Sequence, residues 1–331
     1  MPNLIRAFGL LALAMLTTCG SPPPSAMELY RLDQIRQGKI APQPGSPEAC
    51  TPRLIARLPI EIHNRLLIVP VSVNGQDVRL IVDSGAERTT LSEAAAGRLK
   101  LPRDMSRIST SVGIGGSNVN ADAVVSDFKL GSVRLDPVER VAVGTFGFPP
   151  GFADGLLGAD VLLAFGLDID VPGRILAIYS VHRCTSTRPD WSEPFEAIAG
   201  VTAQKDRLLI PFQLDGTAGQ AILDTGASST TIGARMANRL GLTEEKMSLD
   251  RKLVQSGVGA GTVTAHYHWF RELRVGPSVT KGLMLSVLPI DLGMVDALIG
   301  EDFLEGRRVW LSFPTRQVFV SKLAHEMGLQ P

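Results

Sequence analysis

The sequence contains one long stretch twice. Residues 67–91 read "LIVPVSVNGQDVRLIVDSGAERTTL", and residues 208–232 read "LLIPFQLDGTAGQAILDTGASSTTI". The two copies run in step, 141 positions apart, so Asp83 in the first corresponds to Asp224 in the second. A repeat of this kind predicts two structural units that fold alike, because each copy carries the same local pattern.

Each copy describes the same order of elements. Two apolar runs flank a turn, "VNGQ" or "LDGT", which predicts a β-hairpin. The second run leads into Asp-Ser-Gly or Asp-Thr-Gly, and a short helical pattern follows, "LSEAAAGRLKL" or "IGARMANRLGL". Taken alone, the Asp-containing triplet is ordinary turn chemistry and is weak evidence for a function.

The correspondence extends over most of the chain. Three further pairs of segments match: 112–121 with 256–265, 154–162 with 296–304, and 170–179 with 312–321. Both copies are rich in β-branched runs punctuated by Gly and Pro, which is typical of strands and turns. We therefore expect one lobe over residues 51–185, a linker over 186–202 and a second lobe over 203–325.

The N-terminal residues have the composition of a targeting segment. Residues 1–18 hold one early charge, Arg6, before a short apolar run, which is typical of a signal peptide. The run ends in "LTTCGSPPPS", which resembles a bacterial lipoprotein signal and implies lipidation of Cys19. Residues 19–50 are rich in Pro and suit a tether. We expect an exported protein of the periplasm, anchored in a membrane through Cys19; a plain secretory signal with an incidental cysteine is the alternative.

Composition excludes several classes of protein. Lys plus Arg and Asp plus Glu number 33 each, and there is no basic run, so we expect no nucleic-acid partner. No Cys-x-x-Cys or Cys/His ligand spacing is present, so we expect no metal site. Cys50 and Cys184 bracket the first lobe and are candidates for a disulfide bond, the alternative being two unpaired thiols.

The repeated motifs resemble the aspartic peptidases. "LIVDSGAERTTL" and "AILDTGASSTTI" are similar to the active-site strand of the retropepsin-like branch, and "GLLGADVLLAFG" and "ALIGEDFL" to its second apolar-Gly segment and terminal helix. Retroviral enzymes dimerise one such unit, whereas this chain carries two in tandem. The resemblance implies an all-β fold, mainly strands with short helices, built as two pseudo-symmetric retropepsin-like acid-protease lobes.

The same resemblance implies an aspartic endopeptidase with Asp83 and Asp224 as its catalytic dyad. Two carboxyls held together cannot comfortably ionise together, so they share one proton and activate a water between them. The paired carboxyls of this enzyme family are a well-known case of that effect. The chemistry needs no cofactor. The expected partner is a peptide or protein substrate, and a monomer suffices because both carboxyls lie on one chain.

Neighbouring residues gain expected roles by the same resemblance. Ser84 and Thr225 bond across the pseudo-two-fold axis, and Gly85 and Gly226 leave room for close packing. Ala86 and Ala227 lack the hydroxyl that would lower the pKa of a neighbouring carboxyl, so we expect activity from weakly acidic to near-neutral pH. The expected substrate-binding residues are Glu87 and the glycines of the two flap tips: Gly113, Gly115, Gly116, Gly257 and Gly259.

Other readings stay open. The chain is alternatively a non-catalytic periplasmic binding or scaffold lipoprotein that retains the fold, or a unit in which each Asp serves a separate site with another subunit. Glu87 is alternatively a surface charge that pairs with Arg88. Asp160 and Asp302 are expected to support helix N-termini. His266 and His268 alternate along one strand and are expected to face one side of it.

Overall fold

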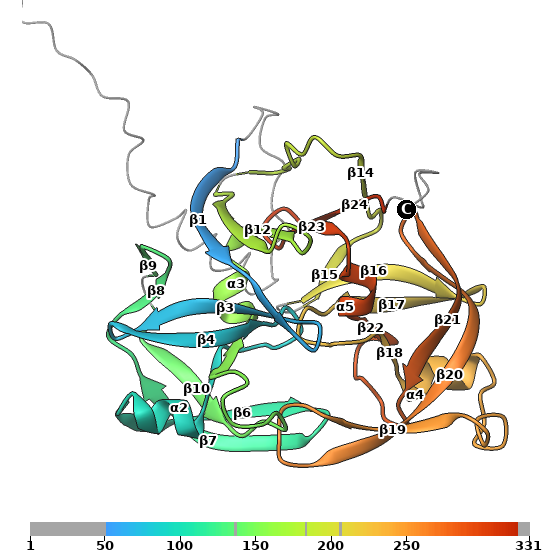
Figure 1. Ribbon diagram of the computed structural model, residues 1–331, viewed down its shortest axis with the longest axis horizontal. Helices are drawn as coiled ribbons and strands as arrows, with labels where there is room; N and C mark the ends of the chain where they lie inside the picture. The colour runs from blue at the N-terminus through green and yellow to red at the C-terminus, as the bar shows by residue number, and fades with distance from the viewer. Residues whose placement is uncertain (1–50, 136–137, 183, 205–206, 324–331) are drawn as a thin grey trace, which may run out of the picture. The chain divides into compact units, whose positions relative to one another are not determined.

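The computed structural model describes residues 51–135, 138–182, 184–204 and 207–323. These residues are mainly β-strand with four short helices, which confirms the predicted fold class (Figure 1). No helix among them is long and apolar enough to cross a membrane. The expected signal peptide, the Pro-rich tether, Cys19 and Cys50 lie outside the described residues.

The first half forms a ten-stranded sheet in the order β6-β7-β10-β5-β11-β4-β3-β8-β9, with β2 on β3. Its strands are β2 (Glu61–His63), β3 (Leu66–Val73), β4 (Gln76–Val82), β5 (Thr90–Ser92), β6 (Arg103–Gly113), β7 (Gly116–Val124), β8 (Phe128–Leu130), β9 (Val133–Arg134), β10 (Arg140–Gly144) and β11 (Gly155–Leu157). Two helices accompany them, α2 (Glu93–Arg98) and α3 (Ala159–Leu162).

The second half forms an eight-stranded sheet in the order β15-β16-β17-β22-β18-β21-β20-β19. Its strands are β15 (Thr202–Gln204), β16 (Arg207–Leu214), β17 (Thr217–Leu223), β18 (Thr231–Ile232), β19 (Arg251–Ser256), β20 (Thr262–Val275), β21 (Ser278–Val287) and β22 (Ala297–Ile299). Its helices are α4 (Ala234–Arg239) and α5 (Glu301–Leu304). In both halves the Asp-bearing strand pairs parallel with a later strand, β4 with β11 and β17 with β22, so the predicted pseudo-symmetry is confirmed.

The hairpins that carry the two Asp residues form where the sequence predicts them. Asn74 and Gly75 have φ values of 50° and 76°, and Asp215 and Gly216 have 48° and 84°. A two-residue turn with both φ values positive matches the twist of the flanking strands, and Asn, Asp and Gly tolerate that conformation best. The "NG" and "DG" pairs therefore fix the register of β3 with β4 and of β16 with β17.

A third sheet of six strands combines both halves, in the order β1-β13-β12-β23-β24-β14 (Figure 1). These strands are β1 (Arg53–Pro59), β12 (Phe165–Asp170), β13 (Ile175–Ser180), β14 (Phe195–Ala197), β23 (Arg308–Ser312) and β24 (Gln317–Ser321). β12 of the first half pairs antiparallel with β23 of the second. The predicted linker 186–202 is thus more than a connection, because it contains β14, an edge strand of this sheet.

An ion pair reinforces the shared sheet. Arg308 donates from Nε and Nη2 to the two carboxylate oxygens of Asp168, at 2.8 and 2.7 Å, and Asp168 is only 2% exposed. Trp191, in the predicted linker, adds a third donor from Nε1 at 3.1 Å. A buried carboxylate with three donors is well satisfied, so this contact holds both halves and the linker in one register.

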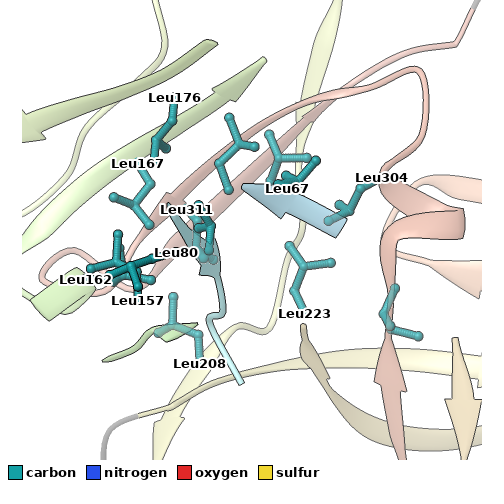
Figure 2. Packing of buried hydrophobic residues seen from close by; sticks show 14 of the residues in the cluster. Leu67, Leu80, Leu157, Leu162, Leu167, Leu176, Leu208, Leu223, Leu304 and Leu311 are labelled. Atoms are coloured by element: carbon teal, nitrogen blue, oxygen red, sulfur yellow. The ribbon is translucent and has the colours of Figure 1, made fainter. Parts of the chain in front are cut away.

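The hydrophobic core also runs through both halves. One cluster of buried side chains includes leucines of the first half and leucines of the second, and Figure 2 shows them packed together. The labelled members are Leu67, Leu80, Leu157, Leu162, Leu167, Leu176, Leu208, Leu223, Leu304 and Leu311. Because close-packed cores resist displacement, this packing fixes the ends of β4 and β17 relative to each other.

Candidate active site

Asp83 and Asp224 meet at the ends of β4 and β17. The backbone N–H of Asp83 donates to Leu157 O at 3.0 Å, and that of Asp224 donates to Ile299 O at 2.8 Å, so each residue is held by the parallel strand beside it. The two side chains are 9% and 8% exposed. Each carboxyl lies against the loop that carries the other: Gly85 packs beside the Asp224 carboxyl and Gly226 beside that of Asp83. The structure therefore brings the two Asp residues of the repeat into one buried pair.

Ser84 and Thr225 bond across the two Asp loops. The Thr225 hydroxyl donates to Val82 O at 2.7 Å and accepts from the Ser84 N–H at 3.0 Å. In the reverse direction, the Ser84 hydroxyl donates to Leu223 O at 2.6 Å and accepts from the Thr225 N–H at 3.1 Å. Both side chains are buried, so these four hydrogen bonds, shielded from water, lock one loop to the other.

Gly85 and Gly226 leave the space that the opposite carboxyl occupies. A Cβ atom on Gly226 would lie 2.3 Å from Asp83 Cγ, and one on Gly85 would lie 2.6 Å from Asp224 Cγ. Neither glycine has a positive φ, so glycine is required at both positions by the lack of space for a side chain and not by the backbone conformation. No side chain larger than hydrogen fits at either position while the two carboxyls stay in place.

The two carboxyls accept different numbers of backbone hydrogen bonds. Asp83 Oδ1 accepts from the N–H groups of Gly85 at 3.0 Å and Ala86 at 2.7 Å. Asp224 Oδ1 accepts from the N–H of Gly226 alone, at 2.9 Å. Hydrogen bonds to a carboxylate favour its ionised form, so the environment favours the negative charge on Asp83.

Burial raises the pKa of both carboxyls. For Asp83, desolvation is the largest cause, and the N–H donors of Ala86 and Gly85 partly oppose it. For Asp224, desolvation and then the negative charge of Asp83 raise the pKa to about 8. Two adjoining buried carboxyls disfavour simultaneous ionisation, and the two N–H donors on Asp83 make Asp224 the better site for a shared proton.

Glu87 pairs with a cation from the other half. Arg207 Nη2, at the start of β16, lies 3.1 Å from Glu87 Oε1. The surface pairing of Glu87 with Arg88 does not occur, because Arg88 has other partners. The counterparts of Arg207 and Glu87 in the repeat are Leu66 and Ser228, so the ion pair exists on one side of the site only. Arg207 was not predicted from the sequence. The only sign of it there is that the first half has Leu66 at the equivalent position.

We expect Arg207→Leu to move both limbs of a pH–activity profile to higher pH. The positive charge of Arg207 lowers the pKa of Asp83 and of Asp224, so its removal raises both values. Leucine is the residue that the first half carries at this position, as Leu66. The measurement is kcat/KM between acid and alkaline pH, with Arg65→Leu as the control for loss of a surface cation. An unshifted profile would show that Arg207 does not act on the pair.

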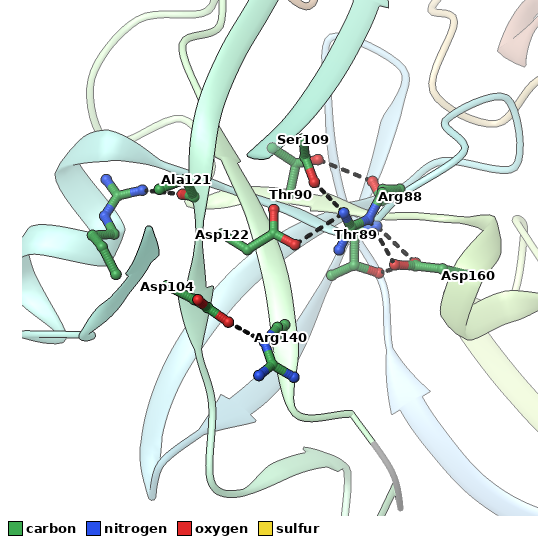
Figure 3. A network of polar contacts seen from close by, with 10 residues as sticks. Arg88, Thr89, Thr90, Asp104, Ser109, Ala121, Asp122, Arg140 and Asp160 are labelled. Carbon is green, nitrogen blue, oxygen red and sulfur yellow. Dashed lines mark hydrogen bonds and ion pairs between the residues drawn. The ribbon is translucent and has the colours of Figure 1, made fainter. Parts of the chain in front are cut away.

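Arg88 connects the Asp83 loop to the β6–β7 hairpin (Figure 3). Its Nη1 donates to Asp122 Oδ2 on β7 at 3.0 Å and also contacts Ser109 Oγ on β6. Its Nε lies 3.9 Å from Asp160 Oδ2, in the first turn of α3. The second half has Ser229 at the equivalent position, so this tie is again present on one side only.

Asp160 and Asp302 lie in the first turns of α3 and α5, as expected, but not at the N-cap positions. Glycines, Gly158 and Gly300, occupy the N-cap positions of α3 and α5, without a side-chain cap bond. Asp160 Oδ1 instead accepts from the N–H and hydroxyl of Thr89, both at 2.7 Å. Asp302 does the same for Thr230, at 2.8 and 2.7 Å. The expected support of the helix N-termini by an acidic residue in the first turn is therefore present, and Asp302 Oδ1 also accepts from the Phe303 N–H at 2.9 Å. Capping is corrected: each Asp also binds the strand that follows its Asp loop.

The two glycine-rich tips meet each other and a loop of the first half. The N–H of Gly261 donates to Gly115 O at 2.8 Å. The loop after β10 adds two more bonds, from Gly147 N to Gly257 O at 2.9 Å and from Gly259 N to Thr145 O at 3.1 Å. Gly113 and Gly116 bound the β6–β7 tip itself. A substrate role for these glycines and for Glu87 stays a prediction.

His266 and His268 both turn toward the segment before β19. Nδ1 of His266 lies 3.1 Å from Met247 O, and Nδ1 of His268 lies 2.7 Å from Asp250 Oδ2. In the part of the chain that the structure describes, no three His, Cys, Asp or Glu side chains gather as metal ligands. Cys184 is disulfide-bonded, and its partner lies outside the described residues.

The duplicated Asp loops, joined by hydrogen bonds across the two halves, are arranged as in an acid-protease type of site. Comparison with known families places the chain accordingly: it matches the aspartyl protease family over residues 69–161 and again over 210–303, more than half of its length. The chain belongs to the aspartyl protease family, and each matched segment contains one of the two Asp loops.

Many chains of solved structures are similar to this one. The chain is similar to the crystal structure of aspartic proteinase from Irpex lacteus, with 15% sequence identity and a TM-score of 0.48. The alignment covers 83% of this chain and 99% of that one. A search of curated proteins found no match.

Proposed function

We propose that the protein is an aspartic endopeptidase in which Asp83 and Asp224 activate a water for attack on a peptide bond. The observation that carries this proposal is the buried carboxyl pair, held face to face by the Ser84 and Thr225 hydrogen bonds. Membership of the aspartyl protease family supports it. A scaffold would not need two carboxyls buried against each other, because their repulsion and desolvation cost stability.

The unequal environments assign a role to each carboxyl. Asp83, with two N–H donors, is the ionised base that takes a proton from the attacking water. Asp224, with a pKa near 8, is the acid that donates its proton toward the oxygen of the scissile carbonyl. When the tetrahedral intermediate collapses, the C–N bond breaks, Asp83 gives the proton it took from the water to the leaving nitrogen, and a hydroxyl of the intermediate returns a proton to Asp224 as the new carbonyl forms, so the pair again holds one proton.

The proposal extends to the branch and the setting of the enzyme. The small size of each half, the alanines at positions 86 and 227 and the presence of two glycine-rich tips support a retropepsin-like peptidase. A peptide or protein substrate would lie between the carboxyls and the tips. One chain supplies both carboxyls, so a monomer is sufficient. Export to the periplasm and a lipid anchor at Cys19 complete the proposal, on the strength of the N-terminal sequence.

A peptide-library assay across pH tests the proposed function. We expect cleavage from weakly acidic to near-neutral pH, with loss above about pH 8 as Asp224 gives up its proton. A peptide analogue with a tetrahedral hydroxyl group in place of the scissile amide should inhibit competitively. A purified, folded chain that cleaves no peptide at any pH would favour a binding or scaffold protein, and an optimum only in strong acid would contradict the retropepsin-like assignment.

A further inference from the structure

Glu301 is a buried carboxyl that the proposed hydrolysis does not use. The residue is 2% exposed, and its Oε1 has no hydrogen-bond partner among the described residues. Glu301 begins α5, and its backbone N–H donates to Ala227 O, in the Asp224 loop, at 2.8 Å. A carboxyl is therefore fixed beside the loop that carries one of the two catalytic candidates.

The fold does not need a carboxyl at this position. The repeat places Ala159 at the same point of the first half, and it is fully buried there. The N–H of Ala159 makes the equivalent bond, to Ala86 O at 2.9 Å. The backbone arrangement is thus the same with alanine, and the carboxyl distinguishes the Asp224 side of the site from the Asp83 side.

Among the described residues, the charged groups that act on Glu301 are acidic. They are Asp224 from the loop after β17, and Asp302 and Glu305 from the segment of α5 itself. Burial is the largest cause and these negative charges follow; together they raise the pKa of Glu301 to about 9. Near neutral pH the side chain is therefore a neutral acid that carries its proton.

The cations near α5 bind other groups. Arg65 Nε lies 3.2 Å from Glu305 Oε2 at the surface. Arg307 donates from Nε to Phe303 O and from Nη1 to Ser321 O, both at 3.0 Å. Since burial penalises an ionised carboxyl that has no donor, the described residues around Glu301 favour its neutral form.

We propose that Glu301 is a positioning residue of the catalytic site, which must keep its proton for the Asp224 loop to hold its active geometry. The inference rests on the proposed function. An ionised Glu301 is a buried charge without a donor, so the start of α5 and the loop bonded to it must open toward water to solvate the charge. Activity at alkaline pH then requires two protons, one on Asp224 and one on Glu301.

The alkaline limb of the pH–activity profile tests this proposal. We expect kcat/KM of the unmodified chain to approach a 100-fold fall per pH unit above about pH 9, where both groups lose their protons. Glu301→Gln and Glu301→Ala should fall about tenfold per unit, because only Asp224 still titrates. The control Glu305→Gln, at a largely exposed side chain, should keep the steep limb. Equal slopes in the unmodified chain and both Glu301 variants would overturn the proposal.

A measurement without substrate separates this inference from the proposed function. Because the pKa of Glu301 is higher in the folded chain than in the unfolded one, the folded state binds the extra proton between about pH 4.5 and 9. Stability therefore falls as the pH rises across that window. The proton on Glu301 makes the equilibrium constant for unfolding increase about tenfold for each pH unit. Denaturant unfolding of the Glu301 variants should lack this contribution. An unchanged slope would overturn the buried proton, whether or not the chain cleaves peptides.

Discussion

Asp83→Asn and Asp224→Asn should each lower kcat by about 10⁴-fold, because an amide can neither take up nor release the proton that the pair must move. The substitution keeps the shape of the side chain, so binding of a tetrahedral peptide analogue should be weakened far less than turnover. The measurement is steady-state kinetics on a peptide that the unmodified chain cleaves. Either variant keeping a tenth of the activity would contradict a shared dyad.

Stability provides the check that these variants are folded. The pKa of Asp224 is raised from 3.8 to about 8, so the folded state holds a proton that the unfolded state releases, and stability falls as pH rises through that window. Asp224→Asn removes this dependence. The stability of the variant, measured relative to that of the unmodified chain, should therefore be more favourable at pH 7 than at pH 4. Asp160→Asn is the matched control, since Asp160 binds Thr89 and not the dyad. It should cost stability and leave kcat within a few-fold.

Gly226→Ala should lower kcat/KM by at least about 100-fold, because small misplacements of catalytic groups have large effects on rate. The new Cβ would lie 2.3 Å from Asp83 Cγ, so the Asp83 carboxyl must move out of its present position. Gly85→Ala should act in the same way on Asp224, with 2.6 Å between the new Cβ and Cγ. Kinetics and a thermal unfolding curve measure both effects.

Gly97→Ala is the matched control for the glycine variants. Gly97 lies within α2, and a Cβ there meets nothing within 4 Å. Alanine should leave activity unchanged and raise stability by up to about 1 kcal/mol, because it reduces the freedom of the unfolded chain. Full activity in Gly226→Ala would show that the Asp loops are less tightly packed than the structure indicates.

The repeat made the shared parts of the molecule predictable. What both copies encode, such as the hairpin turns at Gly75 and Gly216 and the helices after the Asp loops, follows from two matching patterns. The crossed hydroxyls of Ser84 and Thr225 were expected from the resemblance to the aspartic peptidases. The placement of both Asp residues at the ends of equivalent strands follows in the same way. Such features depend on local sequence and on symmetry, which can be read along a single chain.

The parts that escaped sequence analysis are those that only one copy carries. The Glu87–Arg207 pair, the Arg88 network and the buried Glu301 each join or place residues whose counterparts differ. Because these contacts depend on which distant side chains meet in the folded chain, no periodicity indicates them. The strand within the predicted linker escaped for a related reason: Phe195–Ala197 is short, and its partner β24 lies far along the chain.

The pairing of β12 with β23 would limit how a substrate enters the proposed peptidase. Residues Gly166–Asp170 are hydrogen-bonded along Ser312–Arg308, with the Asp168–Arg308 ion pair beside them. A rigid-body movement that separated the two halves would break the backbone hydrogen bonds between β12 and β23 and the buried Asp168–Arg308 ion pair. The backbone hydrogen bonds at the glycine-rich tips are few by comparison, so in the proposed peptidase we expect a polypeptide to enter where the hairpin ends separate, with the shared sheet staying intact.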